Sequence, residues 1–185
     1  MSSFLVLYGT SEGQTAKVTD AVVDALAGRG HAVEAVDVES SSNINVGVFD
    51  AVVVGSSVHM GGHNERVCDF VRDNAGALSA RPTAFFQLSL SSAVDDEERR
   101  AEAAGYVEEF LEETGWNPDR VGVFGGALRY SKYGFLKRLM MKRIAKEATG
   151  DTDTSRDYEY TDWDEVEAFT DDFAAFVEGR LGEQR

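Results

Sequence analysis

The stretch FLVLYGTSEGQT, residues 4–15, decides the fold. Five apolar residues are followed by a turn rich in hydroxyl groups and glycine, and a segment with helical spacing begins directly after it. Strand, loop and helix therefore follow one another here. The same alternation runs through the chain and predicts a βαβ series, which folds as a doubly wound α/β sandwich, a parallel sheet with helices on both faces.

Short apolar runs mark the predicted strands. They lie at residues 4–8, 32–38, 49–56, 83–90 and 120–127, and the third and fourth are apolar enough to be buried on both faces. The last helix is expected to begin near Asp162, with Glu165 as the partner of a capping box. Five strands in such a series favour the order 2-1-3-4-5, in which ligands bind outside the carboxyl ends of strands one and three.

Composition limits the class of protein. The chain has 185 residues, of which 43% are apolar and only two are proline, so we expect one globular domain, residues 1–185. No stretch reaches the roughly 20 apolar residues of a membrane span, and MSSFLVLYGT at the start has no basic flank of a signal peptide. We therefore expect a cytoplasmic protein. The single cysteine, Cys68, is expected to be a small buried residue.

Charge is unevenly distributed along the sequence. The net charge of −15 argues against nucleic-acid binding and could reflect a high-salt cytoplasm. Residues 129–146 nevertheless contain seven basic side chains and no acidic one. This basic window belongs to residues 128–160, the segment that does not fit the βαβ plan, and we call this segment the insert.

The loop GTSEGQT, residues 9–15, has the chemistry of a phosphate site. Thr10, Ser11 and Thr15 offer hydroxyl donors, Gly13 lets the backbone approach closely, and the following helix directs free N–H groups at an anion. The loop matches neither G-x-x-x-x-G-K-[ST] nor G-x-G-x-x-G, so neither a nucleoside-triphosphate loop nor a dinucleotide fingerprint is supported. An ordinary helix-capping loop uses the same residue types, and Glu12 raises the question of which anion would tolerate it.

Two further loops lie at the same predicted edge of the sheet, GSSVHMGGHNE at residues 55–65 and LSLSSAVDDEE at residues 88–98. A flat ring held between them would be flanked by backbone and by His59 or Met60, with Ser89 and Ser91 near its polar rim. His59 and His63 suggest a metal instead, but two glycines separate them and no third ligand is near, so no metal is expected.

These residues resemble a known family. TSEGQT and GSSVHMG are similar to flavodoxin-type FMN proteins, whose first loop commonly reads T-x-T-G-x-T, and the acid at Glu12 narrows the likeness to the quinone-dependent protoporphyrinogen IX dehydrogenases, with T-R-D-G-Q-T. Residues 126–169, GALRYSKYGFLKRLMMKRIAKEATGDTDTSRDYEYTDWDEVEAF, resemble the long insert of that family. Two features depart from it: Met60 stands where an aromatic is common, and SSAVDDEE is less basic.

The resemblance implies an FMN enzyme of haem biosynthesis that removes six electrons from protoporphyrinogen IX in three two-electron steps and passes them to a quinone. Glu12 would point outward while backbone and hydroxyl groups hold the phosphate. His59 is a candidate proton relay or a plain contact at the ring edge, and Arg129 and Lys132 are candidates for the substrate propionates. The implied cofactor residues are Thr10, Ser11, Glu12, Gly13, Gln14, Thr15, Ser57, Val58, His59, Met60, Gly61, Ser89, Leu90 and Ser91.

Two other functions fit the same fold. A flavodoxin-type electron carrier would use an acidic rim to meet basic partners, but it has no evident use for a basic helix. A response-regulator receiver needs acidic residues at the end of strand one, where Tyr8, Gly9 and Thr10 stand, and is rejected.

The basic window predicts an amphipathic helix. Its apolar positions are Leu136, Leu139, Met140 and Ile144, and its basic positions are Lys137, Arg138, Lys142, Arg143 and Lys146. Such a helix can pack on an acidic domain, or mediate self-association into a homo-oligomer. The sequence favours a third use, peripheral contact of residues 129–146 with an anionic membrane on its cytoplasmic face, near membrane quinone.

Overall fold

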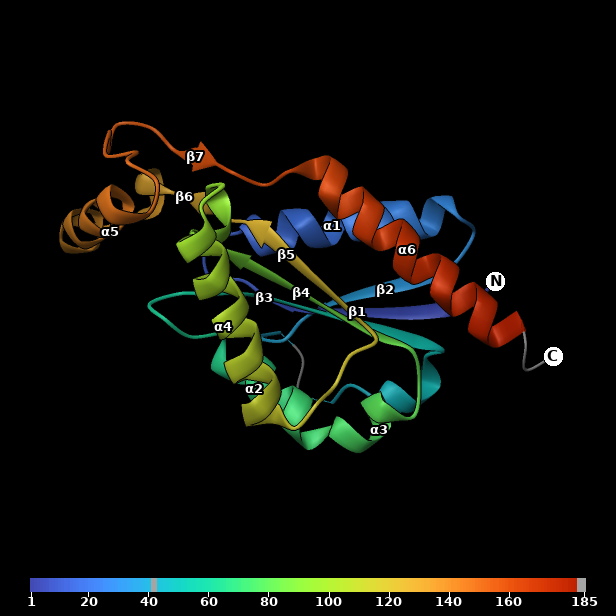
Figure 1. Ribbon diagram of the computed structural model, residues 1–185. Helices are drawn as coiled ribbons and strands as arrows, with labels where there is room; N and C mark the ends of the chain where they lie inside the picture. Colours follow the sequence, from blue (N-terminus) through green and yellow to red (C-terminus); the bar gives the residue numbers. More distant parts are fainter. Residues whose placement is uncertain (41–42, 183–185) are drawn as a thin grey trace.

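The computed structural model describes residues 1–40 and 43–182. In these residues the main sheet has five strands in the order β2-β1-β3-β4-β5, which confirms the predicted order. Neighbouring strands pair in parallel, so their carboxyl ends meet at one edge of the sheet (Figure 1). The strands are β1 (Ser3–Gly9), β2 (Ala32–Asp37), β3 (Ala51–Ser57), β4 (Thr83–Ser89) and β5 (Arg120–Gly125).

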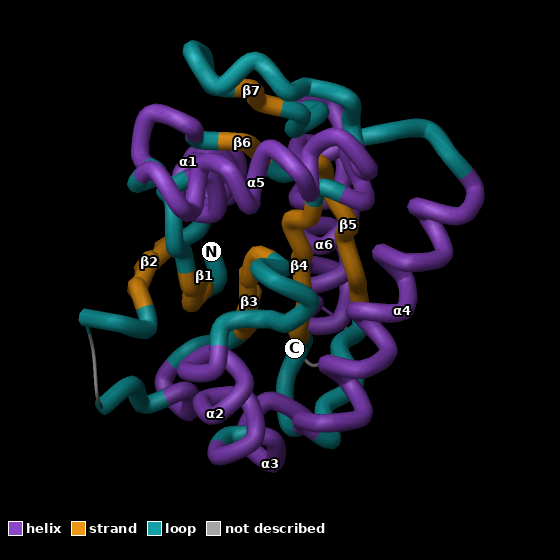
Figure 2. Tube along the Cα trace, turned by 90° about the vertical axis from the view of Figure 1, so that its left-hand side faces the viewer, coloured by secondary structure: helices purple, strands orange, loops and turns teal. Residues whose placement is uncertain are grey.

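Helices cover both faces of this sheet (Figures 1 and 2). One face carries α1 (Gln14–Gly28) and α6 (Trp163–Gly182), and the other carries α2 (Glu65–Asp73), α3 (Ala75–Ser79) and α4 (Glu97–Thr114). Short helical turns occur at η1 (Val46–Val48) and η2 (Ser91–Ala93). Asp162 caps α6, since its Oδ1 accepts the amides of Asp164 and Glu165 at 3.0 and 3.3 Å. The last helix thus begins where the sequence predicts it.

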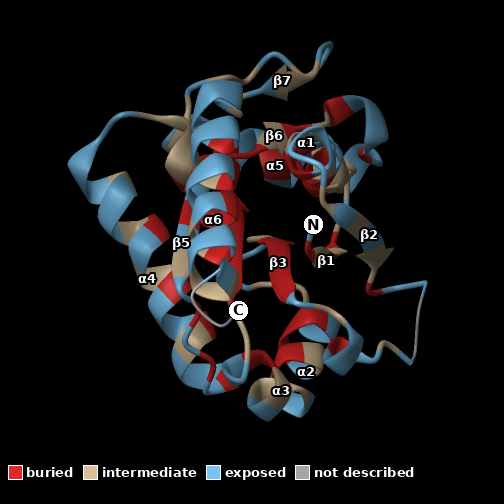
Figure 3. Cartoon of the chain, turned by 90° about the vertical axis from the view of Figure 1, so that its right-hand side faces the viewer, coloured by how far each residue is buried: buried red, intermediate tan, exposed pale blue. Residues whose placement is uncertain are grey.

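The core follows from the alternation of side chains along each strand. In β1, Phe4 and Val6 pack toward α1 and α6, whereas Leu5 and Leu7 pack toward α2, α3 and α4. Strands β3 and β4 are buried along nearly their whole length, as predicted for strands covered on both faces (Figure 3). Cys68 is buried among the α2 side chains, and burial raises the pKa of its thiol to about 11.

The predicted fifth strand, 120–127, ends earlier in the structure. Strand β5 stops at Gly125, and the chain then forms β6 (Ala127–Leu128), which pairs antiparallel with β7 (Tyr158–Glu159). Gly125 has a steric reason to be glycine, because a Cβ atom there would lie 2.4 Å from the carbonyl oxygen of Tyr160. The end of the insert therefore crosses the chain at this point, which ends the strand.

The insert lies beyond the carboxyl edge of the sheet, where β6, β7 and α5 gather (Figures 1 and 2). It contains η3 (Tyr130–Lys132) and α5 (Phe135–Ala148). Its side chains form a small core of their own, made of Leu128, Tyr130, Tyr133, Met141 and Ala145.

The apolar stripe predicted for this helix is divided in the structure. Leu136, Leu139 and Met140 are exposed, whereas Ile144 packs against the core of the insert. The buried face belongs to Met141 and Ala145, which share a core with Tyr130 and Tyr133. No helix in the described residues is long and apolar enough to cross a bilayer.

Candidate functional site

The loop between β1 and α1 is shaped by Gly13. Its φ of 94° lies in the left-handed region that glycine adopts without strain. The Gly13 amide donates to Thr10 Oγ1 at 2.9 Å, which leaves the hydroxyl hydrogen of Thr10 free to donate elsewhere. The first turn of α1 has no acidic residue and no side-chain cap, so its free amides and the positive end of the helix dipole are available to an anion.

A pocket opens between this loop, the end of β3, the end of β4 and the start of the insert. The hydroxyls of Ser11, Thr15 and Ser57 make no hydrogen bond to another residue in the described chain, so they are free to bind a ligand. Free hydroxyls and amides beside apolar walls fit a phosphate with an attached flat ring. The pocket is lined by Thr10, Ser11, Glu12, Gln14, Thr15, Ser57, Val58, His59, Leu88, Ser89, Leu90, Gly126 and Ala127.

Most of the residues predicted to hold a cofactor meet in this pocket, and four do not line it: Gly13, Met60, Gly61 and Ser91. Met60 is 70% exposed, because His59 and Gly62 exchange backbone hydrogen bonds that carry Met60 to the tip of a turn. Met60 itself has a φ of 51°. The Ser91 hydroxyl donates to Glu102 Oε2 at 2.8 Å, away from the pocket.

The two histidines of the second loop occupy different surroundings. His59 lines the pocket. His63 is turned into the α2–α4 layer, where its Nε2 lies 2.8 Å from Gln87 Oε1 and its ring is 4.9 Å from that of Phe110. Burial lowers the pKa of His63, so the ring is neutral at neutral pH. Among residues 1–40 and 43–182, no three His, Cys, Asp or Glu side chains are grouped to hold a metal.

The resemblance implies that Glu12 points outward into solvent, and the structure contradicts this expectation. Its side chain is 14% exposed and is turned toward the insert. Tyr133 donates its hydroxyl to Glu12 Oε2 at 2.7 Å, and Lys137 Nζ lies 3.1 Å from Oε1, an ion pair without hydrogen-bond geometry. Contact with this carboxylate and burial together raise the pKa of Tyr133 well above its usual range, with burial the larger cause. Two partners from the insert thus contact the acid inside the predicted phosphate loop, residues 9–15, which we call the phosphate loop.

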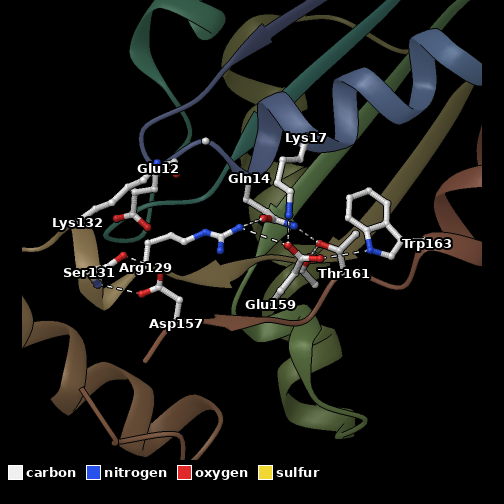
Figure 4. A network of polar contacts seen from close by, with 12 residues as sticks. Glu12, Gln14, Lys17, Arg129, Ser131, Lys132, Asp157, Glu159, Thr161 and Trp163 are labelled. Carbon is white, nitrogen blue, oxygen red and sulfur yellow. Dashed lines mark hydrogen bonds and ion pairs between the residues drawn. The ribbon is translucent and has the colours of Figure 1, made fainter. Parts of the chain in front are cut away.

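The insert reaches the loop through further contacts, drawn in Figure 4. Lys132 Nζ donates to the carbonyl oxygen of Glu12 at 2.9 Å. Arg129 donates to Gln14 Oε1 at 2.5 Å, and Gln14 in turn donates to Thr161 Oγ1 at 2.9 Å. Both cations proposed for the substrate therefore lie against the phosphate loop.

Glu159 joins the same network from β7. It accepts from Lys17 at 2.5 Å and from Arg129 at 3.3 Å, and the hydrogen bond from Lys17 is the largest cause that lowers the pKa of this carboxyl. Helix α1, the loop before it and the insert are thereby connected through the side chains of Lys17, Glu159 and Arg129.

Sequence reasoning missed several residues of the site. Leu88, Gly126 and Ala127 line the pocket. The letters GAL at 126–128 belong to a motif that the sequence does single out, but nothing local shows that they face a ligand. The insert contacts of Glu12 have no sequence signal either, since Tyr133 is 121 residues away.

Known proteins are similar to this chain in sequence or in fold. A family model described as the flavodoxin domain matches residues 5–155. The "Protoporphyrinogen IX dehydrogenase [quinone]" of Escherichia coli strain K12 is 33% identical over 170 residues, 92% of this chain and 93% of that protein. The protein of the same name from Leishmania major is 33% identical over 92% of this chain and 74% of its own length.

Among solved structures, a short-chain flavodoxin associated with a bacterial microcompartment is similar, with a TM-score of 0.60 at 13% identity. The likeness covers 96% of this chain and 99% of that one. At this identity the comparison supports the fold alone.

Proposed function

The chain belongs to the flavodoxin-domain family, in the group of the quinone-dependent protoporphyrinogen IX dehydrogenases, and from this membership we propose that it oxidises protoporphyrinogen IX to protoporphyrin IX with a quinone as acceptor. The cofactor of this family is FMN. The observation that carries the proposal is the pocket of free hydroxyls at the start of α1, placed directly against a basic insert. We propose that residues 1–185 form one domain for this activity.

The pocket residues fit FMN in two parts. Thr10, Ser11 and Thr15, with the amides at the start of α1, would hold the phosphate. Ser57, Val58, His59, Ser89 and Leu90 would surround the flavin ring. When bound, FMN supplies two-electron redox chemistry between a reduced tetrapyrrole and a quinone, and the protein supplies position and electrostatics.

The protein must also manage protons, since each two-electron oxidation removes two protons from the substrate along with the two electrons. His59 lines the pocket, and we assign it as a relay that accepts a proton at an imidazole nitrogen and returns it to solvent. His63 is unsuited to this task, because it is turned into the α2–α4 layer and already bonded to Gln87.

Arg129 and Lys132 are proposed to receive the propionates of the substrate. Arg129 bonds to Gln14 and Lys132 to Glu12, two residues that line the pocket, and charge-assisted bonds from such cations recognise carboxylates well. Both also donate to the phosphate loop in this structure. Binding of a propionate would therefore exchange or share one of these bonds.

Anaerobic stopped-flow spectroscopy tests the function. Flavin in the wild-type protein should be reduced by protoporphyrinogen IX and reoxidised rapidly by a soluble quinone, while exchange with ferredoxin-like proteins stays slow. Slow reduction by the tetrapyrrole with fast exchange with ferredoxins would contradict the proposal and support an electron carrier. That second function is favoured by one observation, the acidic surface outside residues 129–146.

We further propose that α5 contacts an anionic membrane, which would bring the pocket near membrane quinone. Phe135 and Leu136 are 76% and 80% exposed at the start of the helix. Lys142, Arg143 and Lys146 form no ion pair with any described carboxylate and line a hollow of about 530 Å³ together with Leu139, Gly150 and Thr152. Free cations beside exposed apolar groups suit lipid phosphates, at about 1 kcal/mol for each cation near the surface.

Flotation with liposomes tests the membrane contact. Wild-type protein should float with anionic vesicles at low salt and remain in solution with neutral vesicles. Leu136→Glu with Leu139→Glu should not float but should keep FMN. If wild type does not float at low salt, the membrane contact is wrong, and a concentration-dependent dimer that the double variant abolishes would assign the exposed face to self-association instead.

A further inference from the structure

The phosphate loop is held on its outer side by side chains of the insert. Glu12 accepts from Tyr133 through its carboxylate and from Lys132 through its backbone carbonyl. Gln14, two residues after Glu12, is buried and accepts a hydrogen bond from Arg129. The loop therefore depends on a segment about 120 residues later in the chain for its conformation.

The negative charge of Glu12 lies within the loop proposed to bind a phosphate. A carboxylate inside a phosphate loop repels the phosphate, and it would weaken cofactor binding unless its charge were balanced. Lys137 provides that balance, 3.1 Å from Oε1, while the hydroxyl of Tyr133 satisfies Oε2. Both balancing groups come from the insert, so the acid suits the site only when the insert is docked.

We propose that Glu12 is a positioning residue through which the insert holds the phosphate loop, so that FMN binding and docking of the insert strengthen one another. The proposal rests on FMN as cofactor, and it goes beyond the proposed reaction. By thermodynamic linkage the coupling is reciprocal: FMN stabilises the docked insert by the same factor by which the docked insert tightens FMN.

The direction in which Glu12→Gln changes FMN affinity distinguishes this role from simple repulsion of the phosphate. If Glu12 only repels the phosphate, Glu12→Gln should bind FMN more tightly. If Glu12 holds the insert, the same variant should bind FMN more weakly, within the roughly 5- to 150-fold range typical of coupled sites. Tyr133→Phe removes the hydroxyl that donates to Glu12 and accepts from the Arg129 amide, without changing charge, and should weaken FMN binding in the same direction.

The experiment measures FMN and riboflavin affinities of the full-length apoprotein by flavin fluorescence. Riboflavin has no phosphate, so its affinity should be the same in wild type, Glu12→Gln and Tyr133→Phe. The double variant should lose less than the product of the two single effects, because both substitutions weaken the same attachment of residue 12 to the insert. Trypsin cleavage within α5 should be slowed by FMN in the wild type, and this protection should shrink in the variants.

Glu113→Gln is the matched control. Glu113 also pairs with a cation, Arg72 at 2.8 Å, but near the end of α4 and away from the pocket, so its FMN affinity should equal that of wild type. Equal or tighter FMN binding by Glu12→Gln, with wild-type binding by Tyr133→Phe, overturns the coupling and leaves the proposed function standing. A wild-type protein that takes up no FMN overturns both. If Glu12→Gln fails to fold, Tyr133→Phe alone decides.

Discussion

The sheet and the insert are stabilised by different kinds of interaction. In the sheet, β3 and β4 bury aliphatic and aromatic side chains such as Val53 and Phe86, which gain about 25 cal/mol per Å² removed from water. In the insert, the buried tyrosines need partners: the Tyr130 hydroxyl donates to the Asp151 carbonyl and that of Tyr133 to Glu12. A hydrogen bond exchanged with water contributes only about 1 kcal/mol.

This difference implies that the sheet is the rigid part of the protein and the insert the part that can move. Regions with few apolar contacts and many polar ones open locally at low free-energy cost. We therefore expect the insert to undock while the sheet remains folded, and the phosphate loop, which touches both, to report on that motion. The four predictions below test this comparison, beginning with the largest expected effect.

Phe86→Ala should lower the free energy of unfolding by about 3–5 kcal/mol, the usual cost of removing a large buried aromatic side chain. Phe86 is fully buried between β4 and the α1–α6 layer. Chemical denaturation of the apoprotein measures the change. Phe135→Ala is the matched control, because Phe135 in the insert is 76% exposed and its loss should cost less than about 0.5 kcal/mol. Similar losses for both variants would remove the contrast between the two regions.

Thr10→Val should weaken FMN binding by roughly 1.5–3 kcal/mol, the value of a hydrogen bond to a charged group. The Thr10 hydroxyl accepts from the Gly13 amide and has its hydrogen free for the phosphate. Titration of apoprotein with FMN measures this effect. Thr114→Val removes a buried hydroxyl bonded to Phe110 within α4, and its FMN affinity should not change. An unchanged affinity for Thr10→Val would exclude Thr10 from the site.

Tyr160→Phe should destabilise the docked insert by about 1 kcal/mol, because it removes the hydroxyl bonded to Asp151 Oδ2 at 2.5 Å. Hydrogen exchange of residues 128–160 should accelerate about fivefold, while exchange in β3 and β4 stays constant. Tyr106→Phe, which removes a hydroxyl bonded to Glu102 in α4, should leave exchange in the insert unchanged. Faster exchange throughout the sheet would show that the two regions unfold together.

His63 gives the smallest expected effect, a pH dependence located in the sheet region. Burial holds its folded-state pKa below the unfolded value of about 6.5. The unfolded chain therefore binds more protons below that pH, and stability falls as pH falls from about 6.5 toward the folded pKa. The change stays under the roughly 1.4 kcal/mol per pH unit of one titrating group. The denaturation midpoint of His63→Gln should depend less on pH between pH 7 and 5 than that of wild type. If the midpoints of wild type and variant depend equally on pH, the dependence belongs to other groups.

The sheet could be predicted because its physical cause is local. Runs of buried apolar residues, as in β3, and a hydroxyl-rich loop after β1 are visible in a few neighbouring letters. Residues 10–15 alone therefore predict the phosphate part of the candidate site, and the structure brings all of them except Gly13 into one pocket. The early end of β5 was not predicted, because it depends on the approach of Tyr160 from a distant part of the chain.

Three further features of the structure, at Glu12, Met60 and α5, differ from the sequence prediction because local sequence patterns do not determine them. Nothing near Glu12 in the sequence indicates Tyr133 as its partner. The exposed position of Met60 follows from a tight turn with a φ of 51°, which a sequence pattern of strand and helix does not encode. In α5, spacing alone could not decide which of two apolar faces meets the tyrosines, and Met141 rather than Leu136 does so.

The contacts that the insert and Thr161 make with the phosphate loop also set an order of events during synthesis. Gln14 and its partner Thr161 are 147 residues apart. A ribosome adds about 5–20 residues per second, so roughly 7 to 30 s pass between the two. The strands β1, β2 and β3 are complete early in that interval, whereas the residues that hold the loop, from Arg129 to Thr161, are made near its end. Under the proposed coupling, tight FMN binding therefore waits until the insert has been synthesised and has docked.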